Sequence, residues 1–348
     1  MDIEGDLRLI VRAAAETGPT LLENIRRTHI PQPVVRLRNF WHELRFGNRT
    51  PSRGVSNALH HYNRGNEIFW NYLDPSMTYT CAYWKNETRT LAEAQQNKLD
   101  HVCRKLLLTP GESLIDVGGG WGGLLFHACK NYGVTGTNVS PTIDQNRWIL
   151  NKAREKGLSE KIFIQEKDFR EVTGSFDKYV SLGVFEHAGK RQLRDWVRSM
   201  AGCLKEGGIG LLHFIAHDRP METDFFIRKH IFPGGYLPGL SETIAIMAEY
   251  GLEILDIENL RRHYALTLDA WAKNFEAHWT PSGSATPIIS TSDSAAPGKP
   301  ISTSARSVSA QTTQCCGSIR SRFPRETHRP IPWTGDFYIR ATNQRNLP

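Results

Sequence analysis

Three residues whose side chains could take part in acid–base or nucleophilic chemistry lie in separate segments. Cys81 belongs to an aromatic-rich stretch at residues 77–84, Glu186 lies in the stretch 183–189, and His213 lies within an apolar run. Each also has an ordinary structural interpretation, as a small buried thiol, a helix-capping acid and a core histidine. They form a site only if the fold brings them together, which depends on where the strands and helices around them lie.

A glycine-rich turn is the clearest sign of a ligand. Residues 114–123 read LIDVGGGWGG, a short apolar run that ends in Asp116 and is followed by five glycines within six residues. Gly118 and Gly120, together with Gly122, would let the backbone approach a ligand at the start of a helix. The run also satisfies the dinucleotide pattern G-x-G-x-x-G, but an NAD site needs an acid at the end of the second strand, and residues 136–141 contain none. S-adenosylmethionine (SAM) is therefore the favoured ligand, with a purely structural turn as the alternative.

Short apolar runs alternate with helical periodicity from residue 112 onward. We expect strands at Ser113–Val117 and at residues 134–139, 161–165, 179–182, 209–215 and 252–257, and helices at residues 123–132, 142–156, 190–204, 241–250 and 266–279. This alternation predicts an α/β fold with a mostly parallel, doubly wound sheet. Such sheets bind ligands at the carboxyl ends of their strands, which is where Asp116 and Glu186 would lie.

Composition divides the chain into three parts. Residues 1–55 hold nine arginines against six acidic residues and predict a short helical arm, residues 56–279 hold the α/β domain, and residues 280–348 begin with a Ser/Thr/Pro-rich run that predicts disorder. The basic arm suits an anionic membrane surface or a solvated helix face. No stretch is long and apolar enough to span a bilayer. Six scattered cysteines without a Cys-x-x-Cys pair indicate neither a disulfide framework nor a metal site, which fits a reducing cytoplasm.

A second candidate for cofactor binding follows the third predicted strand, where residues 166–169 read Glu-Lys-Asp-Phe. Asp168 could hydrogen-bond an adenine ring that Phe169 flanks. An ordinary surface turn is the alternative interpretation.

Several motifs occur in a fixed order: HHYxxGN at residues 60–66, YTCAYW at 79–84, EAQQxK at 93–98, DVGGGWG at 116–122, FEH at 185–187, LH at 212–213 and IFPGG at 231–235. Together they resemble the cyclopropane-fatty-acyl-phospholipid synthases and the related mycolic acid cyclopropane synthases. The resemblance covers roughly residues 56–279.

The resemblance implies a class I SAM-dependent methyltransferase fold that acts on a cis double bond of a lipid acyl chain and closes a cyclopropane ring. The positions that match the SAM-binding segments are Tyr79, Thr80, Asp116, Gly118, Gly120, Gly122, Asn138, Asp168 and Phe169. The positions that match the binding site of a proton-accepting bicarbonate ion are Cys81, Glu186, His213 and the backbone of Ile215. The aromatic residues that would line the acyl tunnel and stabilise positive charge are Tyr83, Trp84, Phe185 and Tyr236.

The sequence departs from the family pattern in four places. Gly119 replaces a cysteine, residues 63–64 replace an Asp-Leu pair, and Gln145 lies two positions later than expected. After residue 279, the Ser/Thr/Pro-rich run replaces the helix, the tyrosines and the last strand of the family. A missing strand would leave sheet edges unpaired, so we expect weakened SAM binding and impaired catalysis.

Three other functions stay open: a SAM methyltransferase that leaves a methyl branch or another modification, a non-catalytic SAM- or lipid-binding remnant, and an NAD-dependent oxidoreductase. The expected partners are unsaturated phospholipid acyl chains at a membrane surface, with no nucleic acid, and a homodimer is left open. The expected location is cytoplasmic, with peripheral membrane association.

Overall fold

The computed structural model describes residues 32–62, 69–221, 223, 233–278 and 339–341. Within this part of the chain the strands form one sheet in the order β3-β2-β1-β4-β5-β7-β6. Their bounds are β1 (Ser113–Val117), β2 (Thr135–Val139), β3 (Ile162–Gln165), β4 (Phe176–Leu182), β5 (Leu204–His213), β6 (Leu252–Glu253) and β7 (Ile339–Ala341). β1 to β5 pair in parallel, and β7 is antiparallel to both β5 and β6. This is the predicted class of fold.

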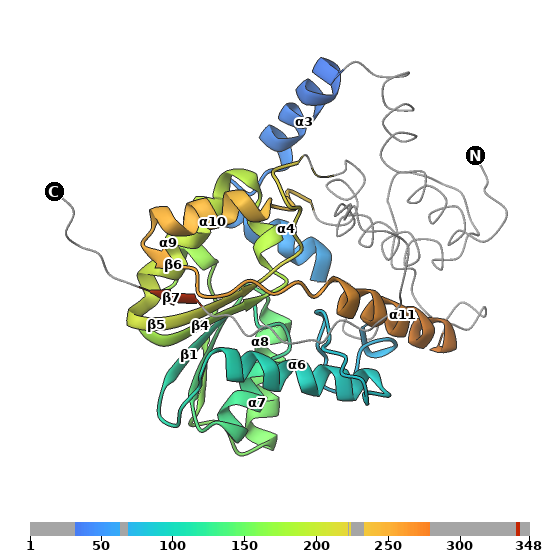
Figure 1. The fold of residues 1–348 in the computed structure, drawn as a ribbon, viewed down its shortest axis with the longest axis vertical. Coiled ribbons are helices and arrows are strands. Elements are labelled where there is room, and N and C mark those ends of the chain that lie inside the picture. Colours follow the sequence, from blue (N-terminus) through green and yellow to red (C-terminus); the bar gives the residue numbers. More distant parts are fainter. Residues whose placement is uncertain (1–31, 63–68, 222, 224–232, 279–338, 342–348) are drawn as a thin grey trace, which may run out of the picture.

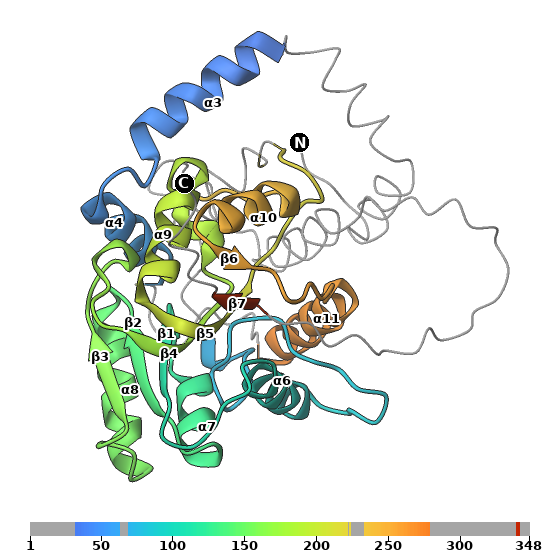
Figure 2. The ribbon, with the colours of Figure 1, turned by 60° about the vertical axis from the view of Figure 1, so that its left-hand side comes forward.

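Helices cover both faces of the sheet, as Figures 1 and 2 show. The described helices are α3 (Gln32–Phe46), α4 (Pro51–Tyr62), α6 (Leu91–Lys105), α7 (Gly123–Asn131), α8 (Ile143–Glu155), α9 (Leu193–Cys203), α10 (Leu240–Glu249) and α11 (Arg261–His278). α6, α7 and α8 pack on one face through a core that includes Leu106, Leu125 and Ile149. α9 and α10 pack on the other through a core that includes Trp196 and Met247. α3 projects away from the body in both views.

A third core joins α11 to the glycine-rich turn. The ring of Tyr79 lies 5.2 Å from that of Trp271, and the ring of Phe69 lies 4.9 Å from that of Trp121. Aromatic rings at these separations pack favourably. The helix at the end of the described domain therefore holds the segment before the sheet against the turn.

The strands and helices of the α/β domain begin or end within a few residues of most predicted limits, because their apolar periodicity is strong. β5 begins five residues earlier than the expected 209, and β6 is a short pair at the start of the expected strand 252–257. α6 was not predicted. Its signal was present in the sequence: the Thr90 hydroxyl accepts a hydrogen bond from the Glu93 amide at 3.2 Å, and the Glu93 carboxylate accepts one from the Thr90 amide at 3.2 Å, which is a capping box.

The structure differs from the expectation that the chain after residue 279 has no strand to complete the sheet. β7 lies between β5 and β6, with Gly210 opposite Ile339 and Leu252 opposite Ala341. Three residues far along the chain thus pair the strand edges that we expected to be exposed. Residues 279–338 and 342–348 lie outside the described residues, so the rest of the predicted disorder stays a prediction.

We predict that β7 stabilises the domain. A chain that ends at residue 338 should lose about 1–3 kcal/mol of unfolding free energy, because β5 and β6 would lose their backbone partners. Urea unfolding of this chain and of a control that ends at residue 341 would measure the difference. Equal midpoints would show that the β7 pairing contributes nothing.

Candidate active site

The glycine-rich turn follows β1 at the carboxyl edge of the sheet and is built as close backbone. Gly118 has a φ of +80°, and a Cβ atom there would lie 2.6 Å from the Val184 side chain. The Gly119 amide donates to the Asn138 side-chain oxygen at 3.1 Å, and that asparagine is fully buried. Side chains in these positions would fill the space against the turn, so glycine is required for the geometry.

A pocket of about 120 Å³ lies over this turn. Of the residues predicted to bind SAM, it is lined by Tyr79, Thr80, Asp116, Gly118 and Gly120. Asp116 is 2% exposed, and one of its carboxylate oxygens has no hydrogen-bond partner among the described residues. Burial raises the pKa of Asp116 to about 7, which the positive charge of Lys98 partly offsets.

Sequence reasoning missed several residues of this pocket. They include Ser140, Thr142 and Gln145 from the start of α8, and His187 and Lys98. The Gln145 side-chain oxygen accepts a hydrogen bond from the Thr142 hydroxyl at 2.6 Å, and its amide nitrogen is buried without a partner among the described residues. The displaced glutamine noted in the sequence thus lies at the pocket wall.

Four of the predicted cofactor residues do not line the pocket. Gly122 forms the start of α7 with a φ of +81°, and Asn138 supports the turn from behind. Phe169 packs against Trp196, with ring centres 4.3 Å apart. These residues shape the elements around the pocket rather than its surface.

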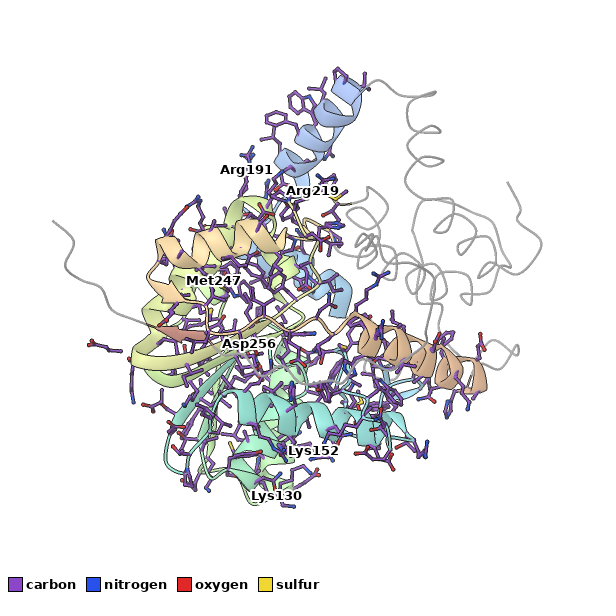
Figure 3. All side chains as sticks on the ribbon, viewed as in Figure 1. Lys130, Lys152, Arg191, Arg219, Met247 and Asp256 are labelled. Atoms are coloured by element: carbon purple, nitrogen blue, oxygen red, sulfur yellow. The ribbon has the colours of Figure 1, made fainter. Side chains whose placement is uncertain are left out.

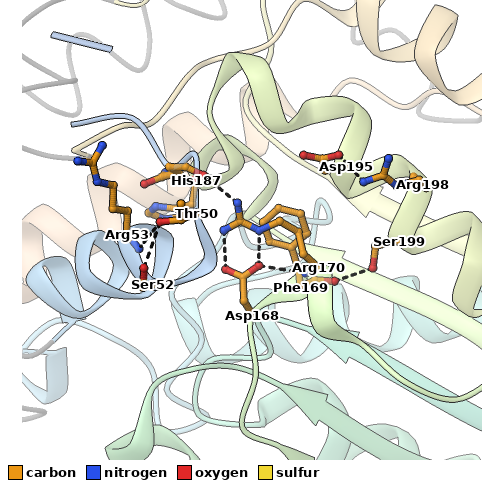
Figure 4. A network of polar contacts seen from close by, with 11 residues as sticks. Thr50, Ser52, Arg53, Asp168, Phe169, Arg170, His187, Asp195, Arg198 and Ser199 are labelled. Atoms are coloured by element: carbon orange, nitrogen blue, oxygen red, sulfur yellow. Dashed lines mark hydrogen bonds and ion pairs between the residues drawn. The ribbon is translucent and has the colours of Figure 1, made fainter. Parts of the chain in front are cut away.

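Asp168 is the fourth, and it forms an ion pair instead. Arg170 donates to the two Asp168 oxygens at 2.6 and 3.0 Å, and the carboxylate is 5% exposed (Figure 4). The same guanidinium donates to the backbone oxygen of Asn48 at 2.9 Å. The side-chain amide of Asn48 in turn donates to the backbone oxygen of His187 at 2.6 Å. Arg170 therefore joins Asp168 to the N-terminal arm, and Asn48 joins that arm to the turn that carries Glu186.

The predicted catalytic residues do come together. Cys81, His213 and Ile215 line a second cavity of about 260 Å³. Glu186 is not among the residues that line this cavity, but it lies beside them: it is 6% exposed, and its carboxylate accepts a hydrogen bond from the Ile215 amide at 2.6 Å. The turn after β4 and the chain leaving β5 therefore meet at one place.

Burial dominates the electrostatics of this cavity. It raises the pKa of Glu186 to about 7, although the Ile215 amide stabilises the carboxylate, and it lowers the pKa of His213 to about 4. One oxygen of Glu186 and the Nδ1 atom of His213 are buried without hydrogen-bond partners in the described part of the chain. Buried polar atoms are normally paired, so these two are available to hydrogen-bond a ligand.

The two cavities share a wall. Thr80, Lys98 and Leu182 line both of them. The rest of the lining of the larger cavity is mostly apolar, and Met247 on α10 is one example. Asp256, beyond β6, is one of its charged residues; Figure 3 labels both. A cofactor over the glycine turn and an apolar substrate in the larger cavity would thus be neighbours.

Comparisons with known proteins show what the chain is similar to. Residues 49–287 match the family model for mycolic acid cyclopropane synthetase. A probable fatty acid methyltransferase of Pseudomonas putida is 35% identical, over 79% of this chain and 68% of the relative. The cyclopropane-fatty-acyl-phospholipid synthase of Escherichia coli K12 is 39% identical, over 63% of this chain and 56% of the relative. The chain thus spans little more than half the length of that relative.

Solved structures give the same result. The mycolic acid cyclopropane synthase CmaA1 complexed with SAH and CTAB matches with a TM-score of 0.64 and 26% identity, over 82% of this chain and 96% of that chain. The cyclopropane synthase MmaA2 from Mycobacterium tuberculosis matches with a TM-score of 0.64 and 26% identity, over 78% of this chain and 94% of that chain. The fold is that of the class I SAM-dependent methyltransferases.

We predict that ionisation of Glu186 destabilises the protein. The pKa of Glu186 is about 7 in the folded chain, compared with the ordinary value of 4.5 that applies to the unfolded chain. The folded state therefore holds this proton more tightly, and the unfolding free energy decreases as pH rises from about 4.5 to about 7. The loss should reach about 3 kcal/mol at most. Glu186→Gln lacks the titration, so the stability of the wild type relative to this variant should fall between pH 5 and pH 8 in urea unfolding. A constant difference would contradict the buried carboxylate.

Proposed function

The chain belongs to the mycolic acid cyclopropane synthetase family, and from this premise we propose that it transfers a methylene group from SAM to a cis double bond of an unsaturated phospholipid acyl chain. The observation that carries the proposal is the shared wall of the two cavities. The glycine-turn pocket and the cavity lined by Cys81 and His213 meet at Thr80, Lys98 and Leu182. Donor and acceptor would therefore be held side by side, away from water.

The pocket residues fit SAM. A Cβ atom at Gly120 would meet nothing within 4 Å, so this lining glycine faces open space. The unpaired atoms of Asp116 and Gln145 offer an acceptor and a donor at the pocket wall. When bound there, SAM would supply an electrophilic methyl group. The chain contributes orientation, since Thr80 and Leu182 stand between the pocket and the apolar cavity.

The larger cavity fits a small anion next to an acyl chain. His213 and Cys81 line this cavity, and Glu186 lies next to it, since its carboxylate is hydrogen-bonded to the amide of the lining residue Ile215. Glu186 and His213 each keep a buried polar atom that lacks a partner among the described residues. With a pKa of about 7, Glu186 can carry a proton and donate it in a hydrogen bond to an anion. A bicarbonate ion held there would supply a base for the proton released on ring closure.

A second candidate function is methylation of the alkene without ring closure. It is favoured by the 35% identity to a protein named as a probable fatty acid methyltransferase. The two reactions share the donor and the alkene, and they differ in whether the added carbon closes a ring.

Product analysis would separate the two functions. Purified protein is incubated with SAM labelled with ¹³C in its methyl group and with vesicles that carry cis-unsaturated chains, and the fatty acids are released for mass spectrometry. Both products gain one labelled carbon. The ring product resists mild catalytic hydrogenation, whereas a methylated alkene takes up hydrogen. We expect the resistant product, and absence of label from the lipid would contradict both functions.

Glu186→Gln tests the site in the same assay. It should lower product formation about 100-fold, as expected for loss of a group that handles a proton. Glu249→Gln is the matched control, because Glu249 is an exposed residue that pairs with Arg194 at the surface. Equal activity of wild type and Glu186→Gln would remove Glu186 from the site.

We also propose that α3 docks on an anionic membrane surface, from which the acyl chain enters. The described part of α3 exposes Val34, Leu37, Phe40 and Trp41, with exposed fractions between 47% and 62%.

Positive charge lies next to this apolar face, since Arg45, Arg49 and Arg53 are exposed at the base of α3. Figure 3 places Arg191 and Arg219 at the same end of the molecule. An apolar helix face beside positive charges suits anionic lipid headgroups. Within the described residues, no helix is long and apolar enough to cross a bilayer.

We predict that the double variant Leu37→Asp/Trp41→Asp binds anionic vesicles at least about tenfold more weakly than wild type, because two exposed apolar side chains lose their contact with lipid. Leu150→Asp, on α8, is the control, since Leu150 is also exposed but lies on another helix. Vesicle sedimentation measures the effect. Unchanged binding, or a change from dimer to monomer in the variant, would assign this face to another role.

A further inference from the structure

The motif EAQQxK at residues 93–98 has been given no role so far beyond the place of Lys98 at the shared wall. Glu93 forms the capping box of α6 and is structural. Two of its other residues, Gln95 and Lys98, contact the segment before the sheet. Gln95 donates to the backbone oxygens of Thr78 and Thr80 at 3.2 and 2.9 Å, and Lys98 donates to the Thr80 hydroxyl at 3.0 Å. α6 thus holds the strip that separates the two cavities.

Lys98 is unusual because its charge is buried. The residue is 4% exposed and lines both cavities. Within the described part of the chain its ammonium group donates one hydrogen bond, to Thr80, and forms no ion pair with an acidic side chain. An ammonium group can donate three hydrogen bonds, and a buried charge without a partner is costly. Two donors are therefore available at the shared wall.

We propose that Lys98 binds the carboxylate-type anion that occupies this wall, either the amino-acid carboxylate of the cofactor or a free bicarbonate ion. The proposal rests on the proposed function, since both anions belong to that reaction. Both sources offer the same chemistry, a planar anion with two or three acceptor oxygens. Lys98 is reachable from the cofactor side and from the substrate side, so geometry permits each of them.

Several titratable groups face Lys98 from the elements packed around it. Asp74 and Cys81 approach from the segment before α6, Asp116 from β1, Cys103 from α6, His127 from α7 and His213 from β5. Burial lowers the pKa of Lys98 to about 8, and the acidic groups only partly offset this. A bound anion would return the ammonium to a paired state and raise its pKa.

Binding measurements test the proposal without requiring turnover. Calorimetric titrations use S-adenosylhomocysteine, which carries the amino-acid carboxylate, and 5′-methylthioadenosine, which lacks it. Bicarbonate binding is followed by line broadening of ¹³C-labelled bicarbonate. The proteins are wild type, Lys98→Met, Lys98→Arg and Thr80→Val. Thr80→Val removes the hydrogen-bond acceptor and keeps the charge.

If Lys98 binds the cofactor, Lys98→Met should weaken S-adenosylhomocysteine binding about tenfold or more, and should change methylthioadenosine binding by less than about twofold. If it binds bicarbonate, both nucleoside affinities should persist, and the line broadening should be lost. Lys98→Arg should retain most of either effect. If Lys98→Met binds both S-adenosylhomocysteine and bicarbonate with wild-type affinity, the proposal is overturned. Absence of nucleoside binding in the wild type would instead overturn the proposed function.

The pH dependence provides a test should Lys98→Met not fold. Wild-type affinity for the anion should fall above about pH 8, as Lys98 loses its proton. The guanidinium of Lys98→Arg stays charged, so its affinity should persist to higher pH. The amino group of the ligand titrates equally in both proteins, and identical profiles would therefore contradict a charged role for Lys98.

Discussion

The site depends on one constraint: parallel strands end at the same edge of a sheet. β1, β4 and β5 are neighbours, so the glycine-rich turn, the turn with Glu186 and the chain leaving β5 must converge. The convergence is tightened by the hydrogen bond from the Ile215 amide to Glu186, which joins the ends of β4 and β5.

Burial gives the site its chemical character. Desolvation is the largest influence on the pKa values of Lys98, Asp116, Glu186 and His213. In each case it disfavours the charged form, and three of the four keep a buried polar atom that has no partner among the described residues. A folded chain retains such atoms at the expense of stability. Asp116 and His213 line two adjoining cavities, and Glu186 is hydrogen-bonded to Ile215 of the larger one, which favours a ligand site over an ordinary core.

The N-terminal arm is connected to this site more closely than its composition suggested. Asn48 is 3% exposed and contacts both Arg170 and the backbone of His187, next to Glu186. The backbone amide of Tyr236, from a third segment, donates to the backbone oxygen of Glu186 at 2.9 Å. A helix that would dock on lipid is thus attached to the same residues that hold the turn after β4.

The sheet, the glycine turn and the family could be predicted from the residues alone, because alternating apolar runs and closely spaced motifs are local signals. The resemblance also indicated that Cys81, Glu186 and His213 belong together. The folded chain was needed to show that Asp168 pairs with Arg170 instead of facing the pocket, that β7 completes the sheet, and that Lys98 is buried between two cavities. Each of these depends on which distant groups a side chain or strand meets. Local periodicity carries no information about such partners, since burial and pairing arise only when the chain has folded.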